Sequence, residues 1–352
     1  MDNKFFICLK VVTAYIGAVI GAGFASGQEI LQFFILHGNQ GLWGVLLATI
    51  LFAYLGGLVM YLSIRQQTTN YQDFLSFLLA PGLVKIVDKI NLIILFGGLI
   101  VMMAGSAAVF GEHFGLPPRA GVIFVFVFTS IVIIGGLDGF LTANVLLVPL
   151  KLFAVVLITC IAIIKAKGGM LLLPTLMPGG GVGGHWVWAS LLYVSYNMLV
   201  PLAVLSSLGK SITLRNGVIG GIAGGLLLGV AVSLVTVAGL LYLPALITCQ
   251  IPLLYLAGYL GSGFYWVLGL LIWLAILTTA IANAHGIASR LAPQGGLYYR
   301  LTGIGACLIA MPLASFDFKD LIRFLYPLFG YAGLFLLVCL LAIPIIKFYS
   351  NR

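Results

Sequence analysis

Long apolar stretches separated by short polar segments dominate this chain of 352 residues. A helix needs about 20 apolar residues to cross the hydrocarbon core of a bilayer. Measured against that length, the pattern predicts ten membrane-spanning helices, at residues 5–36, 41–64, 87–111, 119–136, 142–166, 186–209, 214–243, 263–288, 297–315 and 320–348. The sequence therefore predicts an all-α polytopic membrane protein with a single transmembrane domain over residues 1–352.

The segment 244–262 does not fit this pattern. Pro244 and Pro252 interrupt it, and a proline removes a backbone donor and clashes with the preceding helical turn. We expect a short helical hairpin or a re-entrant segment here instead of a further span.

The first predicted span is interrupted at residues 17–30. Four glycines share this segment with Ser26, Gln28 and Glu29. Each glycine weakens a helix by about 1 kcal/mol relative to alanine, and irregular backbone at membrane depth is tolerated only where it is buried in protein or lines a cavity. The pattern therefore favours a broken helix at a binding site over a simple anchor.

A second interruption falls in the sixth predicted span, at residues 193–201. Pro201 disturbs the helical hydrogen bonds there, and Ser195 and Asn197 can satisfy the backbone groups that it frees. The glycine-rich loop 178–184 divides the ten spans into two sets of five. Broken helices one and six in two such sets are typical of an inverted repeat of transporter halves, here at about residues 5–166 and 186–348.

Composition agrees with the membrane assignment and adds a topology. Charged residues make up only 7% of the chain, against about 25% in soluble domains. The net charge of +9 comes from short loops, not from a basic tract that would bind nucleic acid. Eleven of the 17 Lys and Arg residues lie on the N-terminal side of the membrane and five on the other. The positive-inside rule then places both termini of this cell-membrane protein in the cytoplasm.

The seventh predicted span carries glycines at a regular spacing of four, at Gly217, Gly221, Gly225 and Gly229. Small residues at this spacing let a neighbouring backbone approach closely. We interpret the stripe as a packing surface without a role in binding.

The first interruption also carries a resemblance to a known family. Its residues are Gly21-Ala22-Gly23-Phe24-Ala25-Ser26-Gly27-Gln28-Glu29, followed by Phe33-Phe34. This motif resembles the first helix of the YkvI-like amino-acid permeases of bacteria, in the amino acid–polyamine–organocation superfamily. The resemblance extends over the chain by length and span number. It implies the LeuT-type fold of five plus five helices and transport of a small molecule such as an amino acid.

Both interruptions supply candidate substrate-binding groups. Backbone donors in the first break suit a carboxylate, and carbonyls with polar side chains in the second break suit an amine. The candidates are Gly21, Ala22, Gly23, Phe24, Ser26 and Gly27 in the first break and Ser195, Tyr196 and Asn197 in the second. Met103 and Ser106 of the third span add a wall of the pocket, for which ordinary helix packing is the alternative.

Lys151 lies about ten residues inside an apolar run, too deep to reach the interface easily. An apolar environment favours the neutral form of a lysine, so we expect Lys151 to couple proton movement to transport. A permanently charged lysine that caps carbonyls of the broken first helix is the alternative. The segment 144–152 resembles the fifth helix of many superfamily permeases, where such a lysine can replace a bound sodium ion in proton-coupled members; Pro149 departs from that pattern.

A sodium site is the competing hypothesis for coupling. Thr278 and Thr279 are adjacent hydroxyls in the eighth span, and Asn283 follows Thr279 by one helical turn. The resemblance to sodium-coupled LeuT-type proteins implies that paired hydroxyls here, with carbonyls of helix one, could bind Na⁺. Threonines in membrane helices often bond only to the carbonyl one turn before. Because a charged Lys151 would repel sodium, we favour H⁺.

Glu29 has two interpretations. Ser26-Gly27-Gln28-Glu29 fits the S-x-x-E pattern of a capping box, which would start the second half of helix one. A carboxylate inside a span is also a functional candidate by default, as a gate or a proton site.

Together these features predict a symporter that carries a small zwitterion, such as an amino acid, by alternating access with H⁺ or Na⁺. A membrane sensor or receptor subunit that binds an amino acid without transporting it is the alternative. The sequence shows no catalytic motif, metal-ligand spacing or cofactor motif, so we do not expect an enzyme. The expected partners are the small-molecule substrate and the lipid bilayer.

Overall fold

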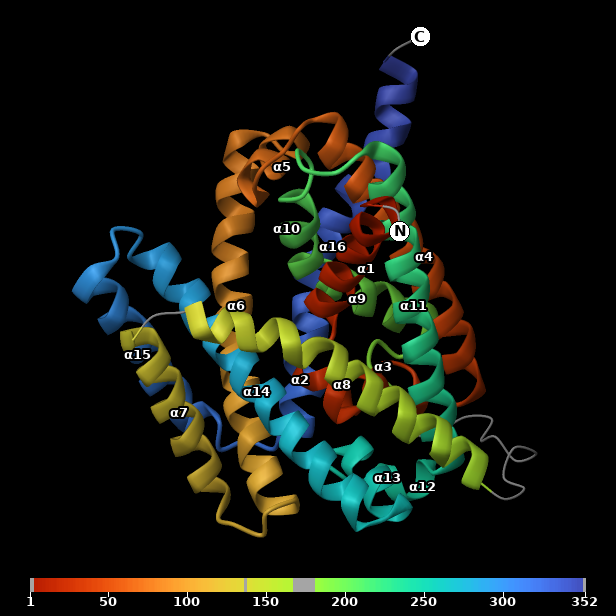
Figure 1. The fold of residues 1–352 in the computed structure, drawn as a ribbon, viewed down its shortest axis with the longest axis vertical. Helices are drawn as coiled ribbons and strands as arrows, with labels where there is room; N and C mark the ends of the chain where they lie inside the picture. Colours follow the sequence, from red (N-terminus) through yellow and green to blue (C-terminus); the bar gives the residue numbers. More distant parts are fainter. Residues whose placement is uncertain (1–2, 136–137, 167–180, 351–352) are drawn as a thin grey trace.

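Every regular element in the described part of the chain is a helix. The computed structural model describes residues 3–135, 138–166 and 181–350 (Figure 1). The elements in chain order are α1 (Asn3–Val19), α2 (Ala22–Ser26), α3 (Gln28–Phe33), η1 (Ile35–His37), α4 (Asn39–Arg65), α5 (Tyr71–Leu78), α6 (Pro81–Glu112), α7 (Pro118–Gly135), α8 (Asp138–Lys165), α9 (Trp186–Asn197), α10 (Leu199–Ser206), α11 (Leu214–Leu241), α12 (Leu243–Leu246), α13 (Pro252–Leu260), α14 (Ser262–Leu291), α15 (Gly296–Leu313) and α16 (Phe318–Ser350). The all-α fold class is confirmed.

The helices are long and apolar enough for a multi-pass membrane protein. Eight of those in the described residues can each cross a bilayer: α4, α6, α7, α8, α11, α14, α15 and α16. The pair α9 and α10 forms a ninth span that is bent by 40° at Met198. The first expected span is divided into α1, α2 and α3, none of which meets the length of a span alone, so the count of ten stays a prediction.

The structure adds one element that the apolar pattern missed. Helix α5 is a short helix between α4 and α6, and α6 begins at Pro81 instead of 87. The side chain of Asn70 starts α5 by accepting a hydrogen bond of 2.8 Å from the backbone nitrogen of Asp73, an ordinary N-cap. The segment 244–262 forms the short helices α12 and α13, as expected.

The glycine stripe of α11 is a packing surface, as predicted. A side chain at Gly221 would overlap the backbone carbonyl of Gly56 in α4, and one at Gly225 would overlap the backbone of Ala53. The remaining two stripe glycines face α4 side chains in the same way, Gly217 at Met60 and Ile64 and Gly229 at Thr49. The two helices are therefore in backbone contact.

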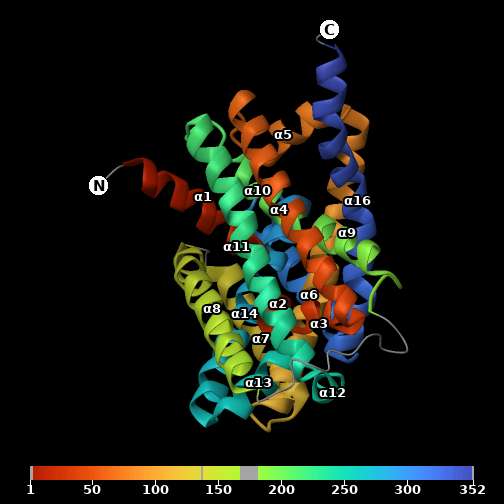
Figure 2. The same cartoon turned by 90° about the vertical axis from the view of Figure 1, so that its right-hand side faces the viewer.

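The broken first helix lies inside the bundle. Every residue of α2 and α3 is buried, and these short helices contact α8, α9, α13, α14 and α16. Figures 1 and 2 place both chain termini in the same half of the molecule, with α12 and α13 at the opposite end. The two halves of the broken helices are paired, because α1 packs on α10 and α3 packs on α9.

Candidate functional site

The first break leaves main-chain groups without helical partners. Helix α1 ends at Val19, and the backbone nitrogen of Gly21 turns back to the Val19 carbonyl at 2.8 Å. In the described residues, no backbone donor reaches the carbonyls of Gly17 and Ala18. The first amides of α2, from Ala22 onward, have no helical acceptor before them. Main-chain carbonyls at the end of α1 and main-chain amides at the start of α2 therefore lie close together, at a buried junction between the two helices.

Helix α14 faces this point with a hydroxyl. The Thr279 Oγ1 lies 4.0 Å from where a side chain of Gly21 would begin. Thr278 and Thr279 both donate to the Ala275 carbonyl, at 3.0 and 2.8 Å, which is the bonding to the preceding turn that we had as the alternative. Asn283 points elsewhere, because its amide lies against Gly98 of α6.

Lys151 lies on the face of α8 that packs near the break. One turn before it, Val148 packs against Gly17 in the last turns of α1, at 3.1 Å from where a side chain would begin. Helix α8 also contacts α2 and α14. The lysine is 3% exposed, and no described residue gives its ammonium a hydrogen bond or an ion pair.

The candidate side chains of the second break divide into two groups. The Ser195 hydroxyl donates to the carbonyls of Leu192 and Gly330, so it ties α9 to α16. The Asn197 amide donates to the Tyr193 carbonyl within its own helix. Tyr196 instead reaches across to the first helix, where its hydroxyl donates to Glu29 Oε2 at 2.7 Å.

The predicted capping box is wrong. The residue before α3 is Gly27, in a left-handed conformation with φ of 80°. The Ser26 hydroxyl accepts from the backbone nitrogen of Gln28 at 3.2 Å and donates to the Gly23 carbonyl at 2.8 Å. Glu29 makes no bond to the Ser26 backbone, because its carboxylate is held by Tyr196. The S-x-x-E motif is present in the sequence, but the Tyr196 hydroxyl of α9 binds the Glu29 carboxylate instead of the backbone.

Glu29 is the centre of a cluster that joins three helices. It is 5% exposed, and the Tyr326 hydroxyl of α16 interacts with the same carboxylate as Tyr196 of α9. Its Oε1 lies so close to Gly23 that any side chain there would overlap it. Tyr326 had no signal in the sequence that would link it to Glu29, since 297 positions separate the two residues.

The third-span candidates lie in ordinary helix packing. Met103 is fully buried. The Ser106 hydroxyl donates to the Gly121 carbonyl of α7 at 2.8 Å and accepts from the Trp273 indole of α14 at 3.1 Å. The Ser106 hydroxyl therefore donates one hydrogen bond and accepts another, both to neighbouring helices.

The C-terminal end of α3 is covered by Val182. The Val182 backbone nitrogen donates to the Gln32 carbonyl at 3.0 Å, and a ring nitrogen of His37 lies 3.2 Å from the Val182 carbonyl. Burial lowers the pKa of the His37 imidazole below its ordinary value, so the ring is neutral near pH 7. Residues 181–185, directly before α9, thus pack on the end of α3.

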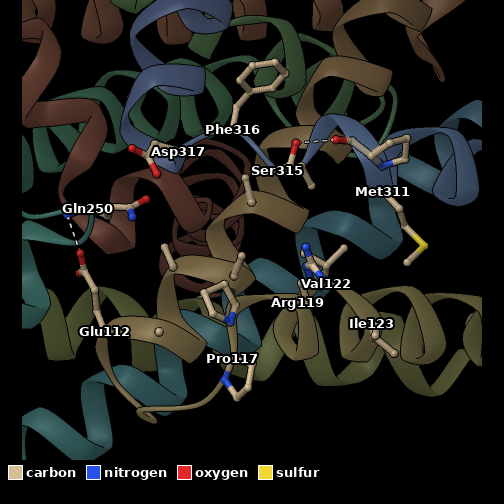
Figure 3. A pocket seen from close by; sticks show the side chains of 17 residues that line it. Glu112, Pro117, Arg119, Val122, Ile123, Gln250, Met311, Ser315, Phe316 and Asp317 are labelled. Atoms are coloured by element: carbon tan, nitrogen blue, oxygen red, sulfur yellow. Dashed lines mark hydrogen bonds between the residues drawn. The ribbon is translucent and has the colours of Figure 1, made fainter.

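A large cavity lies away from the breaks. It measures about 840 Å³ and opens between α6, α7, α15 and the start of α16. Figure 3 shows Glu112, Gln250 and Asp317 on one wall and Arg119 on another. The sequence had not singled out these residues. The residues of α2 and α3 at the first break are buried, whereas this cavity is open to the surface.

Gln250, between α12 and α13, connects the C-terminal end of α6 to the N-terminal end of α16. Its backbone nitrogen donates to Glu112 Oε1, and its side-chain oxygen accepts from the Phe318 backbone nitrogen, both at 3.0 Å. A hydrogen bond of this kind stabilises the bonded state by about 0.5–1.5 kcal/mol. The contact therefore stabilises the packing of α6, the segment between α12 and α13, and α16 at this end of the bundle.

We expect Gln250→Ala to increase labelling of a Leu253→Cys residue by a membrane-impermeant thiol reagent about two- to tenfold, the range that one such bond implies. Leu253 is 1% exposed and packs on Gly27. The background has its five native cysteines changed to serine. Thr248→Ala is the matched control, because that hydroxyl interacts with its own segment, at the Ala245 carbonyl and at Cys249. Equal labelling in both variants would contradict the role of Gln250.

Sequence comparison finds relatives over nearly the full length. No family model matches the chain. It is 32% identical over 346 residues to the uncharacterised Bacillus subtilis protein YyaD, covering 96% of this chain and 97% of that protein. It is 26% identical over 336 residues to the membrane protein YkvI of the same organism, covering 92% of each.

Solved transporter structures share the fold. A Na⁺-coupled sialic acid symporter aligns with a TM-score of 0.62 at 12% identity, over 93% of this chain and 77% of its own. Inward-facing Mhp1 aligns with a TM-score of 0.59 at 13% identity, over 93% of this chain and 75% of its own. A manganese transporter of Eremococcus coleocola aligns with a TM-score of 0.58 at 14% identity, over 95% of this chain and 78% of its own. These neighbours have the LeuT-type fold, which confirms the expected fold class, whereas the repeat boundaries stay a prediction.

Proposed function

The chain belongs to the family of the Bacillus subtilis proteins YyaD and YkvI, and we propose that it is a secondary active transporter of a small zwitterion, such as an amino acid. One observation carries this proposal. The two broken helices lie side by side, and free main-chain groups of the first break meet α14 at a buried point. Unwound backbone between paired half-helices is the usual binding site of transporters with this fold.

The substrate would bind between the halves. Amides at Gly21–Gly27 would hold its carboxylate, and carbonyls of the breaks would help hold its amine. The repeats at about 5–166 and 186–348 would move relative to each other in alternating access. Both termini would face the cytoplasm, on the inner side of the cell membrane.

Coupling would use H⁺ through Lys151. The burial of this ammonium and its lack of a described partner support the proposal, because an unpaired charge in a membrane interior is costly and its neutral form is favoured. The alternative is Na⁺ at Thr279, near Gly21, with its neighbour Thr278. Both alternatives place the coupling ion near the first break.

Uptake into proteoliposomes under separate gradients tests the coupling. We expect a labelled amino-acid pool to accumulate when only an inward proton gradient is imposed, and not when only a sodium gradient is imposed. Accumulation driven by sodium alone and lost in Thr279→Ala would support the sodium alternative. A sensor would bind ligand and accumulate none under either gradient.

A further inference from the structure

The Glu29 carboxylate is a buried acid without a basic partner. It is 5% exposed, between α3, α9 and α16. Among the described residues, no Lys, Arg or His forms an ion pair with it. A buried carboxylate costs several kcal/mol by order of magnitude unless a proton or a cation neutralises it. A proton or a bound cation would neutralise this carboxylate.

The surroundings of Glu29 are aromatic rings with hydroxyl groups. The ring of Tyr196 lies 5.1 Å from that of Tyr326 and 5.6 Å from those of Tyr193 and Phe33, measured between centroids. All four rings come from the two helices that meet at the breaks and from α16. Aromatic faces attract organic cations within about 6 Å of the ring centroid, and a carboxylate among them adds a charged acceptor.

The same region contains buried polar atoms with no partner in the described structure. They are the Tyr193 hydroxyl and the side-chain oxygens of Gln28 and Gln32, which lie on the helix that carries Glu29. Each such group in a native protein requires an explanation. Oxygens are acceptors for an ammonium, which has three donors.

We propose that the Glu29 cluster, formed by Glu29, Tyr193, Tyr196 and Tyr326, binds the protonated amine of the substrate. The inference rests on the proposed transport function and names the chemical class of its cargo, an alkylammonium group. The amine neutralises Glu29, and the rings of the tyrosines pack on its carbon chain. A proton alone would neutralise the carboxylate but would need neither the rings nor the additional acceptors.

Position supports this assignment. Glu29 Oε1 lies against Gly23, inside the first break, and a side chain on Gly23 would overlap it. The Ser195 and Asn197 side chains, the earlier candidates for the amine, have partners inside the protein. Glu29 and its tyrosines therefore replace them as the amine-binding groups.

Ligand-induced stabilisation of the purified full-length protein in detergent tests the proposal. The probes are butylamine, a pool of L-amino acids and the same pool N-acetylated, which lacks the cationic amine. We expect the first two to raise the unfolding midpoint of the wild type and the acetylated pool to leave it unchanged. Glu29→Gln should weaken the apparent affinity at least tenfold, and Tyr326→Phe about threefold, since it keeps the ring and loses one hydroxyl.

The controls keep the result interpretable. Asp320→Asn removes an exposed carboxylate in the first turn of α16, and Tyr298→Phe removes an exposed hydroxyl; both should bind like the wild type. Each variant is compared by its midpoint without ligand, so that misfolded protein is identified. A wild type that does not discriminate against the acetylated pool, or a Glu29→Gln affinity within twofold of wild type, would overturn the proposal.

The experiment separates this inference from the transport function. Glu29-dependent amine binding without any uptake would support the binding site and refute transport. Uptake of amino acids with an unchanged KM in Glu29→Gln would support transport and overturn the role of Glu29.

Discussion

Lys151→Ala should reduce uptake driven by an imposed proton gradient at least tenfold in proteoliposomes, with exchange of substrate retained. The reason is that Lys151 is buried beside the first break and has no described partner to hold its charge. Removing a proton-binding group removes coupling, whereas exchange at equal pH needs no net proton movement. Initial rates with and without the gradient give the measurement.

Lys151→Arg distinguishes coupling from capping. Arginine stays charged in proteins, so it cannot release a proton but can still bind carbonyls of α1. We expect it to lose proton-driven uptake as Lys151→Ala does. Preserved uptake in Lys151→Arg would instead support a permanently charged cap. Lys165→Ala, at the exposed end of α8, is the matched control and should transport normally.

Gly221→Ala should lower the unfolding midpoint of the purified protein by several degrees. The added methyl group would overlap the Gly56 carbonyl, a backbone atom that no rotamer change can move. Overpacking in tight interfaces costs about 1–3 kcal/mol. Thermal unfolding in detergent gives the measurement.

The same substitution at Gly305 is the control. Gly305 lies in α15, and a side chain there meets open space. Glycine to alanine in a helix then gains up to about 1 kcal/mol, so the midpoint should stay equal or rise. Equal destabilisation of both variants would contradict the backbone contact between α4 and α11.

The sequence predicted those features that depend on local spacing. The glycines of α11 repeat every four residues, and the residues at 17–30 and 193–201 disturb a helix through their own backbone chemistry. These local patterns can be recognised without knowing which other helix the segment packs against. The packing surface and the break at Met198 therefore appear in the structure where they were predicted.

The partner of Glu29 could not be predicted in this way. The S-x-x-E motif fits a local cap, but the Tyr196 hydroxyl, 167 positions away, takes the carboxylate instead. The Glu29 side chain could have capped its own helix or bonded to another helix, and the tertiary contacts determined which of the two occurs. The short helix α5 was missed for a different reason, because Tyr71–Leu78 is too short and too polar to register as a span.

Counterflow into proteoliposomes tests the central claim most directly. Vesicles with the wild-type protein are loaded with an unlabelled amino-acid pool and diluted into the labelled pool, with equal H⁺ and Na⁺ on both sides. A carrier with alternating access must accumulate label transiently, and protein-free vesicles must not. Ligand binding in detergent without any counterflow would contradict transport and favour a sensor.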